Sequence, residues 1–445
     1  MTDTTNPLAG LDAIDWAELS HAYGEADDVP GQLRALCDPD AEVRGKALHA
    51  LYGNIFHQGS RYEASAVAVP FLARLAADSA LPGRADVVGL LAALAVGYDE
   101  AHLPDGVDVA GWRREIAEFA AQDREELLAG YDAWVAAAPD EGERAVREMR
   151  RATFDFELHL SAGQAELRAY DAVRGELAGL AALLDDPDPA VRAATAHLLA
   201  WFPEEAAHTL PGLLRLAGEE REPAVRATAI VAAGLIADAD TGTDTGTDAD
   251  ADADADADTN TDADAETADT AHADRLRTHL AARETVVRWA AATALARLGH
   301  GGDPAVLAEL AATAAAPPEP GPPGVPFHDG DLRGYAASTL TRLADRFPDE
   351  ALDAVTDGLA ATSGPGSFAV TQAALHMAFG PERPDRLPAH AELDARRQRL
   401  IRVLADLGED TWRWGNFLAI LRGWGLPTDR QELRAYAGMQ GMQGM

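Results

Sequence analysis

The chain has 445 residues and a formal net charge of −37 at neutral pH, with 74 acidic residues against 37 basic ones. A nucleic-acid binder needs a basic surface to displace counterions from phosphates, so this excess of acid argues against a nucleic-acid partner. The longest strongly apolar run, about residues 87–98, is shorter than the ~20 residues that a membrane-spanning helix needs. Abundant alanine and few β-branched runs favour an almost wholly helical protein.

The amino-terminal segment has neither a basic region nor an apolar signal core, and Cys37 is the only cysteine. A single cysteine cannot form an internal disulfide, and the amino terminus does not resemble a secretion signal. We therefore expect a cytoplasmic location, with no membrane partner.

A short pattern recurs five times along the chain: an acidic residue, an aliphatic residue three positions later, arginine directly after it, and a small residue three positions further on. Its apolar positions recur at helical spacing, and its acidic residue stands where a helix cap is expected. Such self-similarity predicts a stack of helical hairpins. The copies are Asp40, Val43, Arg44 and Ala47; Asp188, Val191, Arg192 and Thr195; Glu222, Val225, Arg226 and Ala229; Glu284, Val287, Arg288 and Ala291; and Asp329, Leu332, Arg333 and Ala336.

Within each copy we expect the aliphatic residue to be buried. The arginine beside it should cover apolar surface with its stem, while its guanidinium reaches an acidic residue of a neighbouring copy. The small residue should let two helices approach closely. These positions are structural predictions and imply no chemistry.

The motif segments DAEVRGKA, DPAVRAAT and EPAVRATA resemble the HEAT-repeat family, in particular the bacterial HEAT-like repeats also found in phycobilin lyases. ETVVRWAA and DGDLRGYA are looser copies. The resemblance covers residues 180–343 well and 33–51 locally. It implies an all-α fold, an α-solenoid of the HEAT/armadillo type built from stacked helical hairpins.

Segment 57–63 follows the first copy and joins two expected helices, one ending near Phe56 and one beginning near Glu63. Its hydrogen-bonding side chains, His57, Gln58, Arg61, Tyr62 and Glu63, lie around a turn that Gly59 can supply. They either tie two helices together or form a binding site for a ligand or partner. No nucleophile with an evident base is present among them.

Two spacings in the array are irregular. Val191 and Val225 are 34 residues apart, a typical helix-turn-helix repeat length. The next two intervals, from Val225 to Val287 and from Val287 to Leu332, are longer, and the tracts 238–274 and 316–326 account for the excess as loop insertions. The first tract consists largely of Asp, Ala and Thr and is predicted to be a disordered acidic loop, and the second is proline-rich and cannot be helical.

Divided by these patterns, the chain is expected to contain five parts. They are N-terminal hairpins at 1–103, divergent long helices at 104–179, the repeat array at 180–380, C-terminal capping helices at 381–437 and a tail at 438–445.

A group of large apolar residues near the carboxyl end lies near helical spacing: Trp412, Trp414, Phe417, Leu421 and Trp424. These residues either seal the last hydrophobic face or form a docking patch. The arginines at 396, 397, 399 and 402 are expected to pair with nearby acidic residues.

The sequence contains no convincing motif for chemistry. The acidic tract lacks the glycine and glutamate positions of calcium loops, no histidine precedes a glutamate as in di-iron HEAT enzymes, and no zinc or nucleophile motif occurs. The G-x-G-x-x-A match at 364–369 follows no strand and is expected to be a turn with Ser367 as helix cap. We predict no catalytic residue, no metal and no cofactor.

The sequence thus favours a non-catalytic scaffold, regulator or inhibitor that binds a partner protein on a helical-repeat surface, and the acidic field favours a basic partner. Two alternatives stay open. One is a HEAT-like lyase that acts on a bilin chromophore, and the other is a HEAT-like DNA alkylation-repair glycosylase, which the net charge disfavours.

Overall fold

The computed structural model describes residues 6–237, 271–381, 384 and 387–439. The contacts divide the chain into two compact units. The first comprises residues 1–98 and 107–183, and the second comprises 99–106 and 184–445. The eight residues 99–106 therefore leave the first unit, pack within the second, and return. The five-part division expected from the sequence stays a prediction.

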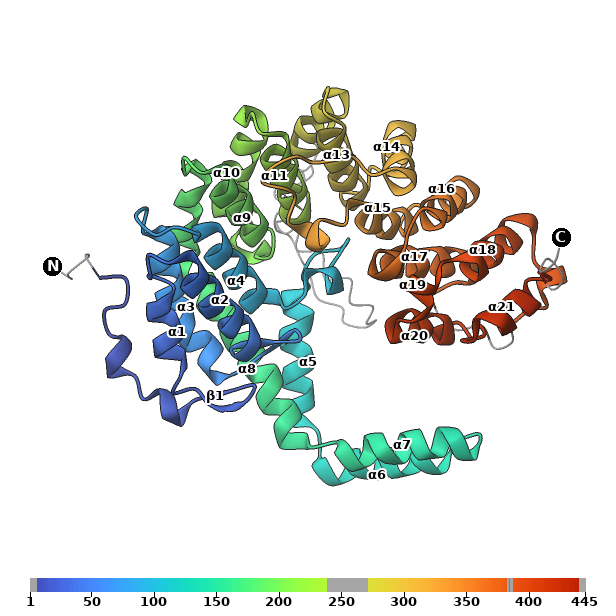
Figure 1. Ribbon diagram of the computed structural model, residues 1–445, viewed down its shortest axis with the longest axis horizontal. Coiled ribbons are helices and arrows are strands. Elements are labelled where there is room, and N and C mark those ends of the chain that lie inside the picture. The colour runs from blue at the N-terminus through green and yellow to red at the C-terminus, as the bar shows by residue number, and fades with distance from the viewer. Residues whose placement is uncertain (1–5, 238–270, 382–383, 385–386, 440–445) are drawn as a thin grey trace, which may run out of the picture. The chain divides into compact units, whose positions relative to one another are not determined.

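The first unit consists of helices and two short β-hairpins (Figure 1). Its helices are α1 (Val29–Ala35), α2 (Ala41–Asn54), α3 (Glu63–Ala77), α4 (Arg84–Val96), α5 (Val109–Ala121), α6 (Arg124–Ala136), α7 (Glu141–Thr153) and α8 (Phe156–Leu180). Its strands pair as β1 (Ser20–His21) with β2 (Gly24–Glu25), and β3 (Phe56–His57) with β4 (Ser60–Arg61), both antiparallel. Helix α8 packs against α3, α4 and α5, so the long helix holds this unit together.

The second unit is a stack of helical hairpins. Its longer elements are α9 (Pro189–Leu199), α10 (Ala206–Glu219), α11 (Pro223–Ile236), α13 (Thr285–Arg297), α14 (Pro304–Ala315), α15 (Leu332–Thr341), α16 (Pro348–Ala360), α17 (Phe368–Phe379), α18 (Ala395–Asp406), α19 (Glu409–Trp412), α20 (Gly415–Gly423) and α21 (Arg430–Tyr436), with helical residues also at 271–277. Short 3-10 turns lie between them, including η3 (Asp99–Ala101), η7 (Thr278–Ala281), η8 (Phe327–Gly330) and η9 (Gly364–Ser367).

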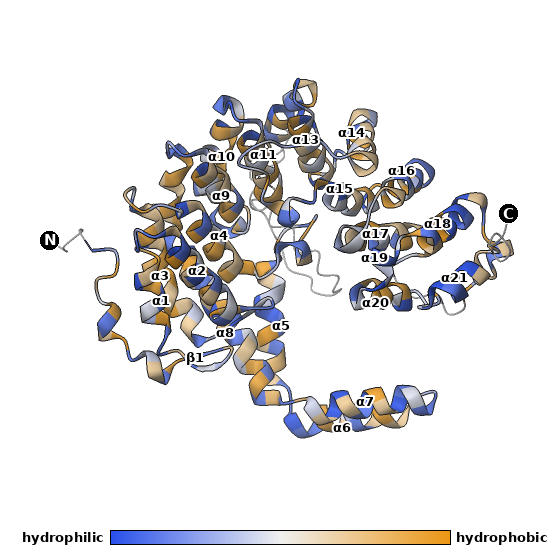
Figure 2. Cartoon of the chain, viewed as in Figure 1, coloured by the Kyte–Doolittle hydropathy of each residue, from blue (hydrophilic) through white to orange (hydrophobic). Residues whose placement is uncertain are grey.

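One row of this stack is formed by the motif helices: α9 packs on α11, α11 on α13, α13 on α15 and α15 on α17. A second row runs through α14, α16 and α18, and α20 covers part of α17. Figure 2 shows hydrophobic residues throughout α11 and α13, which are almost wholly buried. The predicted fold class, an all-α solenoid of stacked hairpins, is confirmed.

The aliphatic residues of the motif are buried in four of the five copies, as predicted. Val191, Val225, Val287 and Leu332 all lie within the packed face of the array. Val43 differs, because it is 36% exposed on α2. The prediction of burial is therefore wrong for the first copy, which lies in the other unit and lacks the neighbouring repeats that cover this position in the array.

The close approach of α11 and α13 has a specific cause. A Cβ placed on Gly234 would lie 2.5 Å from the Cβ of Ala294, well inside van der Waals contact. Glycine is thus required at this crossing. The small residues of the motif contribute in the same way, since Ala229 and Ala291 are fully buried.

The predicted helix starts are largely correct. Asp40 and Asp188 occupy the N-cap positions of α2 and α9 and accept hydrogen bonds there, from the backbone amides two residues further on. Glu222 and Glu284 occupy the N-cap positions of α11 and α13 but accept no such bond. For the copy at Asp329 the predicted helix start is wrong, because the residue that caps α15 lies two positions later, at 331.

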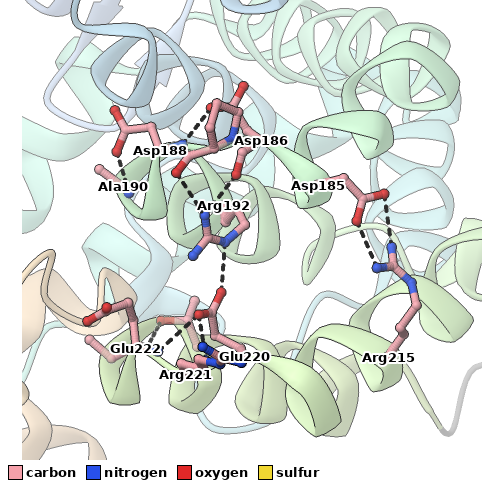
Figure 3. A network of polar contacts seen from close by, with 12 residues as sticks. Asp185, Asp186, Asp188, Ala190, Arg192, Arg215, Glu220, Arg221 and Glu222 are labelled. Carbon is pink, nitrogen blue, oxygen red and sulfur yellow. Dashed lines mark hydrogen bonds and ion pairs between the residues drawn. The ribbon is translucent and has the colours of Figure 1, made fainter.

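The motif arginines behave in part as predicted. Arg192 donates from Nε to Glu220 over 2.7 Å and from Nη1 to the carbonyls of Asp186 and Pro187 (Figure 3). Arg288 pairs in the same way with a glutamate, at position 309. In these two copies the guanidinium forms hydrogen bonds both to the backbone before its own helix and to an acidic residue of a neighbouring segment.

For the other three arginines the predicted ion pair with a neighbouring copy is wrong. Arg44 and Arg333 donate to backbone carbonyls. Arg226 donates to the carbonyl of Ala217 and lies against His279, where a carboxylate was expected. Ion pairing between neighbouring segments is thus a property of two copies and not of the motif as a whole.

Further predictions can be compared with the described residues. The tract 316–326 is irregular, as expected, but residues 271–274 of the acidic tract are helical, with Ala273 buried against the stack. The rest of the acidic tract and the last residues of the tail lie outside the described residues. Among the described helices, none is both long and apolar enough to cross a bilayer.

At the carboxyl end, Phe417 and Leu421 of α20 are fully buried, and Trp424 donates its indole N–H to the carbonyl of Gly380. Helix α20 therefore covers the end of the α17 layer, while Trp414 stays 38% exposed. Among the four nearby arginines, those at 396, 397 and 399 pair with acidic residues as predicted. The arginine at 402 reaches a glutamine, at position 398, instead.

Candidate binding pocket in the second unit

A partly enclosed pocket of about 580 Å³ lies within the second unit. Three stretches of chain line it: residues 100–104, the turn η8 with the later part of α15, and the turn η9 with α17. The side chains that carry its chemistry are Glu100, His328, Asp329, Asp331, Gln372 and His376, and apolar walls are provided by Leu103, Pro104, Phe368 and Ala369.

The crossing segment 99–106 is fixed in this unit by two aspartates. Asp99 is 9% exposed, and its Oδ2 lies 3.0 Å from Nε2 of His197 and accepts the backbone N–H of His328 over 2.9 Å. Asp105 pairs with Arg342, and its carbonyl accepts from Nε of Arg297 over 2.7 Å. These bonds join the segment to α9, η8, α13 and the end of α15.

Electrostatics at Asp99 follow from this geometry. Burial alone would raise the pKa of the carboxyl, but the hydrogen bond from His197 and the backbone N–H of His328 hold that pKa below its usual value. Asp99 is therefore an anion at neutral pH. Because it sits behind the pocket and not in its lining, its role is to position the turn that lines the pocket.

That turn has an unusual backbone. His328 and Asp329 both have positive φ angles, 55° and 51°, a conformation that is uncommon for residues with a side chain. Left-handed residues that are not glycine persist where the surrounding structure enforces them, often at binding sites. Here the bond from the His328 amide to Asp99 and the packing of Phe327 hold the turn, and Asp329 is left exposed at the pocket.

Phe327 is buried in an aromatic cluster beneath the turn. Its ring lies 4.7 Å from that of His197 and 5.7 Å from that of Trp201, both edge-on, and it also contacts Tyr335. Edge-to-face aromatic contacts of this kind stabilise a fixed arrangement. The turn that lines the pocket is thus packed on an aromatic cluster, while Glu100 and Asp329 are exposed to solvent.

The described residues that line the pocket include three carboxylates and two imidazoles but no lysine or arginine. Such a lining attracts a cationic group, and its apolar walls can contact an aliphatic stem. Among the described residues no group of three metal-ligating side chains is arranged to hold a metal ion.

Sequence patterns do not identify this pocket. They predict a helix cap at Asp329 and a turn at 364–369, and both predictions concern local structure. Residues 364–369 do form a turn, η9, that leads into α17. Ser367 stands at the N-cap position of α17, but its hydroxyl donates to the carbonyl of Gly364 instead of capping the helix.

The binding residues predicted from the sequence lie in the first unit, on the hairpin of β3 and β4 and at the start of α3. Gln58 and Gly59 form its two-residue turn, both with positive φ angles, as tight hairpins require. The sequence predicts a turn here but not the two short strands that flank it. Nδ1 of His57 lies 3.5 Å from the hydroxyl of Tyr23, and the two rings meet edge-on.

Two of these residues hold the unit together. Arg61 is buried, lies 3.5 Å from Glu166 of α8, and faces the ring of Trp112. Burial lowers the pKa of Arg61 and raises that of Glu166, while the opposite charges resist both changes. Glu63 accepts two hydrogen bonds from Ser20.

The remaining three are half-buried or exposed. The backbone amide of Tyr62 donates to Oγ of Ser65, the Tyr62 side chain is half-buried, and Gln58 is exposed. Arg61 and Glu63 therefore have structural contacts. A ligand or partner role for all five residues stays a prediction.

Comparison with known proteins agrees with the architecture of the repeat stack. Residues 177–245 match the family described as HEAT repeats, a stretch that contains α9, α10 and α11. No curated protein matches the chain. A crystal structure described as that of an engineered protein, from the Northeast Structural Genomics Consortium, is similar at 18% identity over 93% of this chain and 97% of that one, with a TM-score of 0.24. That degree of likeness supports no conclusion about fold or function.

Proposed function

We propose that the protein binds a partner protein without catalysing a reaction, and that a basic side chain of the partner enters the pocket of the second unit. The observation that carries this proposal is the lining itself. Glu100, Asp329 and Asp331 line the pocket, and the described residues of the lining include no lysine or arginine.

The lining of the pocket suits a side chain of a protein as its occupant. An arginine or lysine carries a long apolar stem and a charged end, which match the Leu103 and Phe368 walls and the carboxylates of the rim. Hydrogen bonds between guanidinium and carboxylate groups are among the stronger polar contacts in proteins. The excess of acidic residues over the whole chain also steers a basic partner toward the surface.

The repeat architecture supports the same class of function. Helical hairpins stacked in series present extended surfaces, and proteins built from them commonly bind other proteins. The match of residues 177–245 to HEAT repeats agrees with that role. A scaffold, a regulator and an inhibitor are three forms of this proposal, and identification of the partner will decide among them.

The two alternatives from the sequence receive no support from the pocket. A bilin lyase needs cationic groups for the propionates of its substrate, and a DNA glycosylase needs a basic groove, whereas this lining is acidic. A spectral change on incubation with bilin would favour the first alternative. Retardation of duplex DNA at low salt would favour the second.

The test is a comparison of partner binding by the wild-type chain and by a double variant, Glu100→Gln with Asp329→Asn. Partners are captured from the native host and identified by mass spectrometry, and a purified partner is then titrated by calorimetry. We expect a partner with a basic surface, at least about tenfold weaker binding by the double variant, and weaker binding at high salt.

A matched control removes two carboxylates elsewhere. Glu115 and Glu118 are exposed on α5, so Glu115→Gln with Glu118→Gln changes the net charge equally without altering the pocket. We expect that variant to bind like the wild type. Equal binding by the pocket variant and the wild type would refute the proposal, and equal losses in both variants would assign the effect to net charge alone.

A further inference from the structure

A second surface lies in the first unit, on the hairpin of α6 and α7. The two helices pack against each other, and none of their residues is buried. Figure 1 shows the hairpin projecting from the end of the α5 and α8 pair, away from α1 to α4. Isolated helices of 13 residues are marginally stable, so a hairpin with no buried residue gains stability if a further element covers it.

A groove of about 1140 Å³ runs along this hairpin at its junction with α5 and α8. One wall is formed by Leu127, Gly130 and Trp134, which follow the i, i+3, i+7 spacing of a single helical face. Thr153, at the end of α7, and Phe154, directly after it, also line the groove. A groove between helices whose lining includes a small residue can accept a third helix.

The aromatic residues of the groove are held in place. The ring of Tyr131 lies 4.6 Å from that of Phe154 and 6.2 Å from that of Trp134. The guanidinium of Arg147 covers the Trp134 ring at 4.8 Å and donates to the Trp134 carbonyl over 2.7 Å. A rigid aromatic residue that lines a groove is the usual form of an interface anchor.

The charges of the groove indicate what covers it. Asp123 and Glu126 lie at the edge formed by the start of α6, and Arg150 and His159 lie at the other edge. The hairpin segment 123–153 carries eight acidic residues and five arginines, so a second copy of the same hairpin would bring like charge. A foreign helix with basic side chains along one side of its apolar stripe is the complementary partner.

We propose that this groove binds an amphipathic helix of a partner protein. Its apolar side chains would lie against Leu127, Gly130 and Trp134, and its basic side chains against Asp123 and Glu126. This site belongs to the first unit and does not depend on the pocket of the second unit, so either proposal can fail alone.

The test uses two synthetic helical peptides of about 18 residues, each with leucine at i, i+3, i+7 spacing. One peptide has lysines beside the leucine stripe, and the other has glutamates at the same positions. Fluorescence anisotropy of the labelled peptides is measured during titration with the full chain. We expect the lysine peptide to bind at least about tenfold more tightly than the glutamate peptide.

Two variants locate the binding. Gly130→Leu fills the groove without removing a contact, because no atom lies within 4 Å of a Cβ built there, and Trp134→Ala removes the anchor. Both variants should lower the affinity for the lysine peptide at least about tenfold. Met149→Ala is the control, since this residue of α7 is 61% exposed and does not line the groove. Circular dichroism checks that each variant keeps its helix content.

Three outcomes would overturn the proposal. The first is no binding of the lysine peptide at about 100 μM, a concentration at which a helix-sized apolar contact should register. The second is wild-type affinity in the Gly130→Leu chain. The third is a wild-type dimer, measured by light scattering, that Gly130→Leu converts into a monomer, because the groove would then hold a second copy.

Discussion

His279 gives the repeat stack a pH-dependent stability that can be isolated by one substitution. The residue lies in η7, is buried, and has its Nδ1 3.0 Å from Nη2 of Arg226, the motif arginine of α11. Burial, reinforced by the positive charge of Arg226, lowers the pKa of His279 from 6.5 to about 4. The imidazole is therefore neutral in the folded protein and accepts a hydrogen bond from the guanidinium.

The direction of the effect follows from proton linkage. Between pH 6.5 and about 4 the unfolded chain binds a proton at His279 and the folded chain does not. The stabilising contribution is thus complete above pH 6.5 and is lost as the pH falls to about 4. At ~1.4 kcal/mol per pH unit, the loss reaches about 3 kcal/mol over the whole range and about 2.5 kcal/mol at pH 4.5.

Substitution of asparagine, His279→Asn, removes the titration and keeps an oxygen acceptor close to the position of Nδ1. Urea unfolding, followed by circular dichroism at pH 7.0 and pH 4.5, gives the free energy of unfolding of both proteins. We expect the variant to lose about 2.5 kcal/mol less than the wild type between these two pH values, because all other titrating groups are shared. Equal losses in the two proteins would refute the reasoning.

Asp99 does not interfere with this measurement. The pKa of its carboxyl is lowered, so its contribution to stability is complete above the ordinary value of 3.8 and is lost only as the pH falls below that value. The two effects therefore occupy separate pH ranges. An unfolding transition that weakens only below pH 4 would assign the acid sensitivity to carboxylates and not to His279.

Three further predictions concern the packing of the stack and its insertion. Gly234→Ala should destabilise the protein by ~1–3 kcal/mol through the clash with α13, whereas Gly175→Ala, at an open position of α8, should stabilise it by ~0.5–1 kcal/mol. Thermal unfolding measures both effects, and a Gly234→Ala variant that is more stable than the wild type would contradict the close approach of α11 and α13. Arg192→Ala should cost ~2–4 kcal/mol, because it leaves the 6% exposed carboxylate of Glu220 without its ion pair, and a double-mutant cycle with Glu220→Gln that gives no coupling would show otherwise. Deletion of residues 238–274 should lower the melting temperature more than deletion of 238–270, since 271–274 belong to a packed helix, and equal melting temperatures would disprove this.

The sequence was sufficient to predict the repeat stack because each copy carries its own local signals. The cap residues Asp188, Glu222 and Glu284 precede α9, α11 and α13 by one position, and the aliphatic residue of each of these copies is buried. Helix starts and apolar periodicity depend on residues within a few positions, so one sequence contains all the information they need. The same signals misplaced the start of α15, where Asp329 and Asp331 both precede the aliphatic residue and only the folded turn distinguishes them.

Contacts between distant segments could not be predicted in this way. The pairing of His197 with Asp99 joins residues 98 positions apart, and the bond from His328 to Asp99 spans 229 positions. No periodicity links such positions. The hairpin of β3 and β4 was also missed, because Gln58 adopts a positive φ angle that residues other than glycine seldom show.

The placement of the candidate pocket follows from the irregularities that break the order of the stack. A regular array buries its apolar faces between neighbouring repeats and presents an extended surface, not an enclosed pocket. Here the segment 99–106 leaves the first unit and lies across the motif helices, where Asp99 and Asp105 bind four separate elements. The insertion 316–326 leads into the turn at His328 and Asp329, which has positive φ angles and lines the pocket beside this segment. Because both excursions depart from the repeat, repeat analysis cannot assign Glu100, Leu103, Pro104 and His328 to the lining, whereas α15 and α17 contribute residues of the repeat helices. A functional site in this unit is expected where the excursions meet these helices.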